Sequence, residues 1–530
     1  MSINSTPSTA PAGRSGFLQA AGIVSAAFVV SRILGLVRVA VIANYYGIDS
    51  LEANAYEIAS RIPEAIFYIV AGGALGSAFI PTFAAYFARD DEAGGWQLFS
   101  VVINLITLVL IVLSALMALF ARPFLQLFFP NLMGQPELLA MTATLLQIIL
   151  VSTIIFGISG VFMGALNARH HFLLPALAPI FYNLGIIGGA VLFAPNVLGL
   201  AIGTVVGAMG HLLIQWPGLR QQKARYQFIF SLDHPGVGQV LRLMSPRVLG
   251  LSFGQLNSFI TLFLGQFAEP GSIPALGNGW RIMIMPQGII GQAIGVAAFP
   301  TFADLAARQA FGEMRRMVAD MLRLIFFLGL PVSLVLGLLP RPVVALFLQR
   351  GQFDEQATQL VAWGLIFYAV GLIPLATLEI ISRAFYALGD TKTPVLVGAL
   401  QLVVAGAAGY VLSQTLFPAL GWLALGGLAL GISLANGLEA GVLLWLLRGR
   451  MAGLDGRYLW AGLWRMGVAA GLMGLVMGGC ERWLAPAGTI PHLIISTTIG
   501  SLIYALFCWL LNLREARQIT AWLQHRLLKS

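Results

Sequence analysis

Charged residues are scarce in this sequence. Of its 530 residues, 10% are charged and 58% are hydrophobic, whereas soluble globular chains carry about 25% charged residues. This deficit excludes an ordinary water-soluble enzyme. The chain has room for about fourteen apolar spans of roughly 20 residues each, the length that crosses a hydrocarbon core of about 30 Å, joined by short loops.

Cysteine and the common catalytic motifs are also nearly missing. The two cysteines, Cys480 and Cys508, both lie in apolar segments, so a disulfide framework is excluded. The sequence contains no P-loop, no HExxH motif and no Cys/His spacing typical of a metal site. These absences argue against an ATP-driven pump and a zinc enzyme, and no cofactor is expected.

Glycine, in contrast, is abundant, with 60 residues that lie mostly inside apolar stretches. Glycine in such stretches lets the backbones of membrane helices approach closely. The apolar runs, ended by charge, proline or glycine clusters, predict an all-α polytopic membrane protein with about fourteen transmembrane helices. We expect them near 17–44, 53–88, 96–121, 138–167, 173–193, 197–219, 238–267, 275–307, 316–348, 356–388, 394–416, 420–447, 459–482 and 490–512.

The basic residues predict the orientation, because short loops rich in arginine and lysine stay in the cytoplasm. With the N-terminus inside, the inside segments hold seventeen of these residues and the outside loops hold four. Both termini are therefore expected in the cytoplasm. The net charge of +9 is explained as a topology bias and requires no nucleic-acid partner.

Two pairs of segments indicate an internal repeat. Residues 72–89 read GGALGSAFIPTFAAYFAR and residues 291–308 read GQAIGVAAFPTFADLAAR, identical at ten of eighteen positions. Likewise SRILGL at 31–36 resembles PRVLGL at 246–251. The repeats are six spans apart, so both halves enter the membrane in the same direction, as in paired-bundle transporters. We expect a tail at 1–16, a first lobe at 17–220, a linker at 221–237, a second lobe at 238–448, two appended helices at 449–513 and a tail at 514–530.

Arginines inside the spans are the candidate functional residues. Arg32 and Arg38 lie in the first span, Arg247 in the seventh and Arg281 in the eighth. Each costs some 2.5 kcal/mol or more at mid-membrane unless it faces water, an anion or a carboxylate. Their distribution over both halves predicts a water-filled cationic cavity, with snorkelling or structural ion pairs as the alternative.

Acidic residues in the spans are candidates for coupling transport to an ion. Glu57 and Glu64 flank Arg61 at helical spacing on one face of the second span, which favours an ion pair within that helix. Glu379 and Glu439 lie in later spans. All four acids remain candidates for a proton or sodium partner, and the membrane potential acting on the arginines is an equal alternative.

Several motifs of this chain, in order, are similar to those of a known family. They are SRILGLVR at 31–38, GGALGSAFIPTF at 72–83, PALAPIFYN at 175–183, QRGQF at 349–353 and FYALGDTKTP at 385–394. They resemble the MurJ (MviN) lipid II flippases of the multidrug/oligosaccharidyl-lipid/polysaccharide exporter superfamily. The resemblance implies fourteen helices in two six-helix lobes with two helices appended. It also implies a cationic cavity for a diphosphate headgroup and a groove by the last two helices for a polyprenyl tail.

Carried over by motif, the family's cavity arginines correspond to Arg32, Arg38 and Arg281, and Arg61 matches a basic position at the start of the second span. Arg247 is a further candidate, because the repeat of SRILGL and PRVLGL aligns it with Arg32. Four family charges are missing, and the positions are occupied by Val39, Phe67, Gly72 and Ile284. The loss of acidic neighbours predicts that Arg38 and Arg281 are freer to meet an anionic substrate.

The sequence thus predicts a flippase of the bacterial inner membrane that moves lipid II, a polyprenyl-diphosphate-linked peptidoglycan precursor, to the outer leaflet. Its expected partners are lipid II, membrane lipids and cell-wall synthesis proteins. Two alternatives stay open: a transport-inactive paralogue that serves as a cell-wall scaffold, and an exporter of another lipid-linked glycan or of drugs.

Overall fold

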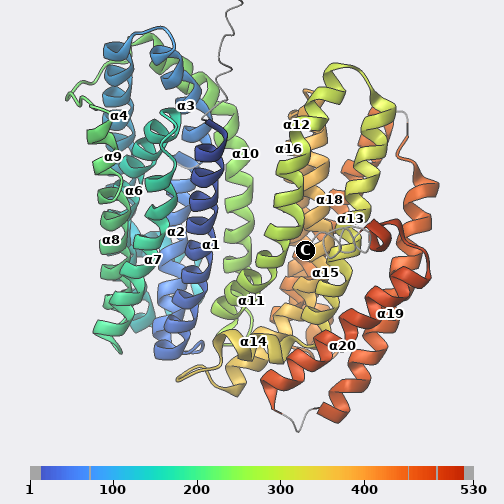
Figure 1. The fold of residues 1–530 in the computed structure, drawn as a ribbon. Helices are drawn as coiled ribbons and strands as arrows, with labels where there is room; N and C mark the ends of the chain where they lie inside the picture. The colour runs from blue at the N-terminus through green and yellow to red at the C-terminus, as the bar shows by residue number, and fades with distance from the viewer. Residues whose placement is uncertain (1–12, 71–72, 452, 485–487, 519–530) are drawn as a thin grey trace, which may run out of the picture. The chain divides into compact units, whose positions relative to one another are not determined.

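The computed structural model describes residues 13–70, 73–451, 453–484 and 488–518, and all regular structure in these ranges is helical (Figure 1). The first helices are α1 Gly13–Tyr46, α2 Leu51–Val70, α3 Gly73–Phe87, α4 Glu92–Leu119, α5 Ala121–Phe128, α6 Pro136–Ala168, α7 Leu173–Phe193, α8 Leu198–Leu213 and α9 Trp216–Gln221. The later ones are α10 Pro235–Gly265, α11 Ser272–Gln287, α12 Ala293–Ala307, α13 Phe311–Leu338, α14 Pro340–Leu348, α15 Glu355–Ala387, α16 Lys392–Val411, α17 Phe417–Ala419, α18 Ala424–Arg450, α19 Gly456–Leu484 and α20 Thr489–Leu510.

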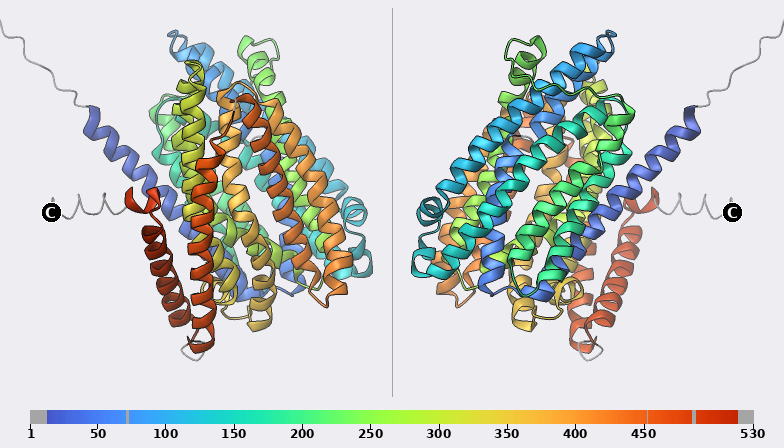
Figure 2. Two further views of the ribbon diagram at one scale, coloured as in Figure 1. Left: turned by 90° about the vertical axis from the view of Figure 1, so that its right-hand side faces the viewer. Right: turned by 90° about the vertical axis from the view of Figure 1, so that its left-hand side faces the viewer.

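The chain divides into two compact units. The first comprises residues 1–45, 59–127 and 136–252, and the second comprises 46–58, 128–135 and 253–530. In the first unit, an aromatic cluster that includes Phe79, Phe83, Trp96 and Phe99 forms a core between α3 and α4. In the second, α19 and α20, red in Figure 2, pack along each other and α19 packs on α13.

Twelve stretches of the described chain are long and apolar enough to cross a membrane. Neither α2 nor α10 is among them. The helix α2 carries four charged residues, and several side chains of α10 lie outside the part of the chain that the structure describes. With these two helices added, the predicted count of about fourteen is approximately met. The helix with the most charged residues, α2, carries three of the candidate site residues, Glu57, Arg61 and Glu64.

Several expected helices are interrupted. The helix expected at 316–348 ends at Leu338, and α14 begins at Pro340. Proline disfavours a helical conformation of the preceding residue, and Leu339 has φ −118° and ψ 43°. The helix expected at 275–307 contains a π-helical turn at Gly288–Gln292, and the one expected at 53–88 is described as α2 and α3, on either side of residues outside the described ranges.

The internal repeat extends to the helix boundaries. A shift of 219 residues maps Glu92–Leu119 onto Phe311–Leu338 and Pro136–Ala168 onto Glu355–Ala387. The same shift relates the turns that end α3 and α12, where Asp90 and Gln309 have φ of 58° and 56°. The two halves of the chain thus repeat helix lengths and C-terminal turns that sequence identity alone does not reveal.

Glycine allows a close helix contact in the first unit. Facing α7 and α8 meet through Gly185, Gly189, Gly199 and Gly203, and a Cβ at Gly189 would lie 2.1 Å from the Gly199 carbonyl oxygen. No side chain fits at that distance, so these glycines bring the two backbones together. For α7 and α8, the predicted packing role of glycine in apolar stretches is confirmed.

We expect Gly189→Ala to destabilise the protein by about 1–3 kcal/mol, because the added methyl group must force α7 away from α8. Its neighbour Gly188 faces open space, with nothing within 4 Å of the position that a Cβ would take, and Gly188→Ala is the matched control. Thermal unfolding of the purified variants in detergent measures the difference. Equal unfolding temperatures for the two variants would contradict this packing.

Candidate functional site

Arg281 on α11 is held by a carboxylate from α2. Its Nη2 donates to Oε1 and Oε2 of Glu57 at 2.9 and 3.0 Å, and its Nη1 donates to Oδ1 of Asn278 at 3.0 Å. All three residues belong to the second unit. The Glu57 side chain is 9% exposed and that of Arg281 is 30% exposed, so one side of the guanidinium stays accessible.

The α11 backbone leaves room for this ion pair. A Cβ at Gly277 would lie 2.6 Å from Oε1 of Glu57 and 3.4 Å from Nη1 of Arg281. Glu57 therefore occupies the space that a side chain at Gly277 would take. The prediction that Arg281 lacks a nearby carboxylate is wrong, because Glu57, distant in sequence, takes the place of the missing acid at Ile284.

Arg38 on α1 lies over an aromatic ring, and within the described ranges it forms no ion pair of 4.0 Å or less. Its guanidinium carbon is 5.7 Å from the ring centroid of Tyr182 on α7. Tyr182 packs edge-on against Phe156 at 5.0 Å, and Phe156 packs against Phe67 at 5.4 Å. Phe67, which occupies a position where the family carries an arginine, thus belongs to an aromatic ladder that supports Arg38. A ring face attracts the guanidinium without neutralising its charge.

The other predicted cationic residues are placed differently. Arg61 pairs with Glu64 one turn further along α2, with 3.4 Å between Nη1 and Oε2, so the predicted ion pair within this helix is confirmed for Glu64. Arg32 is exposed on α1. The side chain of Arg247, like Gly72, lies outside the part of the chain that the structure describes.

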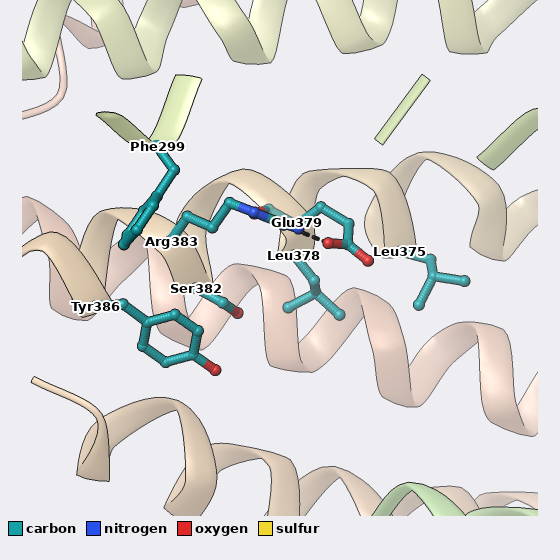
Figure 3. A pocket seen from close by; sticks show the side chains of 7 residues that line it. All are labelled: Phe299, Leu375, Leu378, Glu379, Ser382, Arg383 and Tyr386. Carbon is teal, nitrogen blue, oxygen red and sulfur yellow. Dashed lines mark hydrogen bonds and ion pairs between the residues drawn. The ribbon is translucent and has the colours of Figure 1, made fainter. Parts of the chain in front are cut away.

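Glu379 lies in a pocket of about 410 Å³ between α12 and α15. It pairs with Arg383 one turn further along α15, and the guanidinium also bonds to the Glu379 backbone carbonyl (Figure 3). The pocket is also lined by Ser382, Tyr386 and Phe299. Because Arg383 already balances the carboxylate, Glu379 is a weaker site for a transported cation than its sequence position indicates.

Glu439 on α18 differs from the other acidic candidates. Its side chain is half-buried, and its Oε1 lies 3.5 Å from the position of a Cβ at Gly398 of the neighbouring α16. Among the described residues it forms no ion pair of 4.0 Å or less. Within the second unit, Glu379 and Glu439 lie on different helices, α15 and α18.

The most specific sequence motif has a structural role. In FYALGDTKTP, Gly389 has φ 74° and follows the end of α15. Asp390 then binds the first turn of α16, accepting from the Thr393 N–H at 3.0 Å and from its hydroxyl at 2.7 Å. These hydrogen bonds, from the Thr393 backbone first and its hydroxyl second, hold the pKa of Asp390 below its ordinary value. Arg450 on α18 also pairs with Asp390 at 2.9 Å.

QRGQF has a similar role. Gly351 adopts φ 54°, Phe353 is 1% exposed, and the following Asp354 caps α15 by accepting from the Ala357 N–H at 2.8 Å. Both motifs thus set helix ends.

Four functional or structural residues were missed by sequence reasoning: Asn278, Tyr182, Arg383 and Arg323. Of these, Arg383 could have been found, because Glu379 and Arg383 are four residues apart in an apolar helix. Arg323 on α13 could not, since its partner Glu515 is 192 residues away and the two bond at 2.6 and 3.0 Å. Both side chains of this pair are under 10% exposed.

Comparisons with known proteins identify one family. The family model described as "Lipid II flippase MurJ" matches residues 42–498. A protein of Burkholderia cenocepacia named "Lipid II flippase MurJ" is 28% identical over 396 residues, which are 73% of this chain and 77% of that protein.

Two solved structures share the fold. One is titled "Lipid II flippase MurJ, inward closed conformation", with a TM-score of 0.75, 24% identity and coverage of 91% of this chain and 97% of that one. The other is an inward-facing multidrug resistance MATE family transporter of the MOP superfamily, with a TM-score of 0.68, 16% identity and coverage of 80% and 96%. The fold and the family model agree, and the chain belongs to the lipid II flippase MurJ family.

Proposed function

We propose that this multi-pass membrane protein is a lipid II flippase, a transporter and not an enzyme. It moves a polyprenyl-diphosphate-linked peptidoglycan precursor from the inner to the outer leaflet of the bacterial inner membrane, with both termini in the cytoplasm. The observation that carries this proposal is the family model, which covers residues 42–498 of the 530-residue chain. The apolar helices and the charged residues on α1, α2 and α11 are consistent with it.

Arg38 and Arg281 are the residues that we propose to bind the diphosphate, with Arg32, Arg61 and Arg247 adding positive charge. A guanidinium presents a planar fork of donors that matches two phosphate oxygens as well as two carboxylate oxygens. Arg281 already makes a contact of this kind with Glu57. A substrate phosphate can therefore replace the Glu57 carboxylate at the Arg281 guanidinium. Before the substrate binds, Glu57 holds the guanidinium in the orientation that the phosphate needs.

Glu439 is the acid that we propose for ion coupling. Glu57, Glu64 and Glu379 each pair with an arginine, which offsets the charge that would attract a proton or sodium ion. Glu439 is half-buried in a membrane-spanning helix and has no such pair with any described residue, so it retains that capacity. Cell-wall synthesis proteins stay predicted partners, and this prediction rests only on the proposed substrate.

The proposal is tested by lipid binding to the purified full-length chain in nanodiscs. We expect native mass spectrometry to detect lipid II bound at a stoichiometry of one, and competition by undecaprenyl diphosphate but not by a neutral polyprenol, because the arginines recognise phosphate. Equal competition by the neutral polyprenol would show that the diphosphate is not recognised. Preferential binding of a drug-like cation would favour the exporter alternative.

A further inference from the structure

A second charged pocket is lined by none of the residues proposed to bind lipid II. It has a volume of about 590 Å³ and lies between the N-terminal half of α13, the first turn of α19 and the segment after α20, residues 511–518. Its lining includes Arg316, Asp320, Asp455, Arg457, Tyr458 and Arg514. All of them belong to the second unit.

The carboxylates of this pocket are already engaged. Asp320 accepts from the Tyr458 hydroxyl at 2.7 Å and lies 3.6 Å from Nη1 of Arg514. Asp455 lies 3.8 Å from Nε of Arg315. The exposed guanidiniums of Arg316 and Arg457 form no ion pair of 4.0 Å or less with a described residue. The pocket therefore presents two uncompensated positive charges, which suit an anion.

The face of α19 beside the pocket is shaped for lipid. Arg457, Trp460 and Trp464 lie at i, i+3 and i+7 and so share one face of this helix. Trp460 is 70% exposed and Trp464 is 46% exposed. Exposed tryptophans on a membrane-spanning helix mark the interface between headgroups and acyl chains. The arginine pocket thus continues directly into a lipid-facing surface.

We propose that this pocket binds the phosphate of an anionic phospholipid headgroup, with the acyl chains along the Trp460 and Trp464 face of α19. Arg316 from α13 and Arg457 from α19 contact the same phosphate, so the bound lipid bridges the two helices. The bridge lies beside the buried pair of Arg323 and Glu515, since Tyr458 both lines the pocket and bonds to Arg323 through its carbonyl at 3.1 Å. Bound lipid should therefore hold α19 and the segment after α20 on α13.

The test is a titration of the purified full-length protein in detergent with phosphatidylglycerol, phosphatidylcholine or inorganic phosphate, followed by native mass spectrometry and thermal unfolding. We expect phosphatidylglycerol alone to bind and to raise the unfolding temperature. Each interfacial arginine strengthens attraction to an anionic lipid roughly fivefold, so R316Q/R457Q should weaken binding by about 25-fold. The control R308Q removes an exposed arginine outside the pocket and should leave binding unchanged.

Unchanged phosphatidylglycerol binding by R316Q/R457Q would overturn the proposal. Equal binding of phosphatidylcholine by the wild-type protein would also overturn it, without depending on any variant. Equal stabilisation by inorganic phosphate would mean that the pocket takes a free anion rather than a lipid. Because neither lipid II nor transport enters the assay, its outcome is independent of the proposed function.

Discussion

Replacing Arg281 by alanine is expected to lower lipid II binding and transport about 10- to 100-fold. A hydrogen bond to a charged group contributes roughly 1.5–3 kcal/mol, and Arg281 can offer a phosphate a bidentate contact. The variant should still fold, although Glu57 loses its ion-pair partner. Transport of lipid II in reconstituted liposomes, together with binding to the detergent-purified protein, measures the loss.

Two companion variants separate charge from geometry. Arg281→Lys keeps the charge but loses the planar fork, and we expect only partial recovery. Glu57→Gln removes the carboxylate that competes with phosphate, and we expect lipid II binding to become tighter. Arg350→Ala is the control, because this exposed loop arginine bonds to the Leu346 carbonyl at 3.0 Å, away from Arg281 and Glu57. Wild-type transport by Arg281→Ala would rule out this arginine as a binding residue.

The second large effect is expected from the buried ion pair between α13 and the segment after α20. Arg323→Ala should destabilise the protein by about 3–5 kcal/mol, because it leaves the Glu515 carboxylate buried without its arginine. The guanidinium of Arg323 also lies 4.3 Å from the Tyr458 ring centroid, and this contact is lost too. Thermal unfolding in detergent measures the change.

The double variant Arg323→Met/Glu515→Leu distinguishes two explanations. Either the ion pair itself stabilises the protein, or the protein is destabilised only when one charge of the pair is left without its partner. Replacing both charges with apolar side chains of similar volume is often neutral or stabilising, so we expect it to unfold near the wild-type temperature. The exposed pair of Arg308 and Asp304 supplies the control, since Arg308→Ala should cost no more than about 1 kcal/mol. A double variant as unstable as Arg323→Ala would contradict this interpretation.

Much of the fold could be predicted from the sequence, because its determinants are local or periodic. Apolar run length predicts most spans to within a few residues, and the PTFA repeat locates helices that the structure relates by a shift of 219 residues. The interruption at Leu339 was also readable in principle, since Pro340 follows it. What apolar length could not reveal is that α2, with its four charged residues, does not meet the hydropathy and charge limits that the other spans meet.

The site could be predicted less completely, since partners come from distant segments. The sequence around Ile284 predicts no acid near Arg281, yet Glu57 lies 224 residues away and supplies the carboxylate. In the sequence, Phe67 is noted only because the family carries an arginine at this position. The structure places Phe67 in the aromatic ladder under Arg38. Spacing along one helix identifies the pair of Arg61 and Glu64 and cannot identify contacts between helices.

The most direct test of the proposed function is genetic replacement. A bacterium depleted of its own lipid II flippase should resume growth when it expresses this chain, and Arg38→Ala/Arg281→Ala should fail to rescue at an equal level of membrane-inserted protein. Rescue is expected despite the residues at Val39, Phe67, Gly72 and Ile284, because Arg32, Arg38 and Arg281 supply positive charge to meet a diphosphate. A well-expressed, inserted wild-type chain that neither restores growth nor binds lipid II would contradict the account and favour a scaffold role.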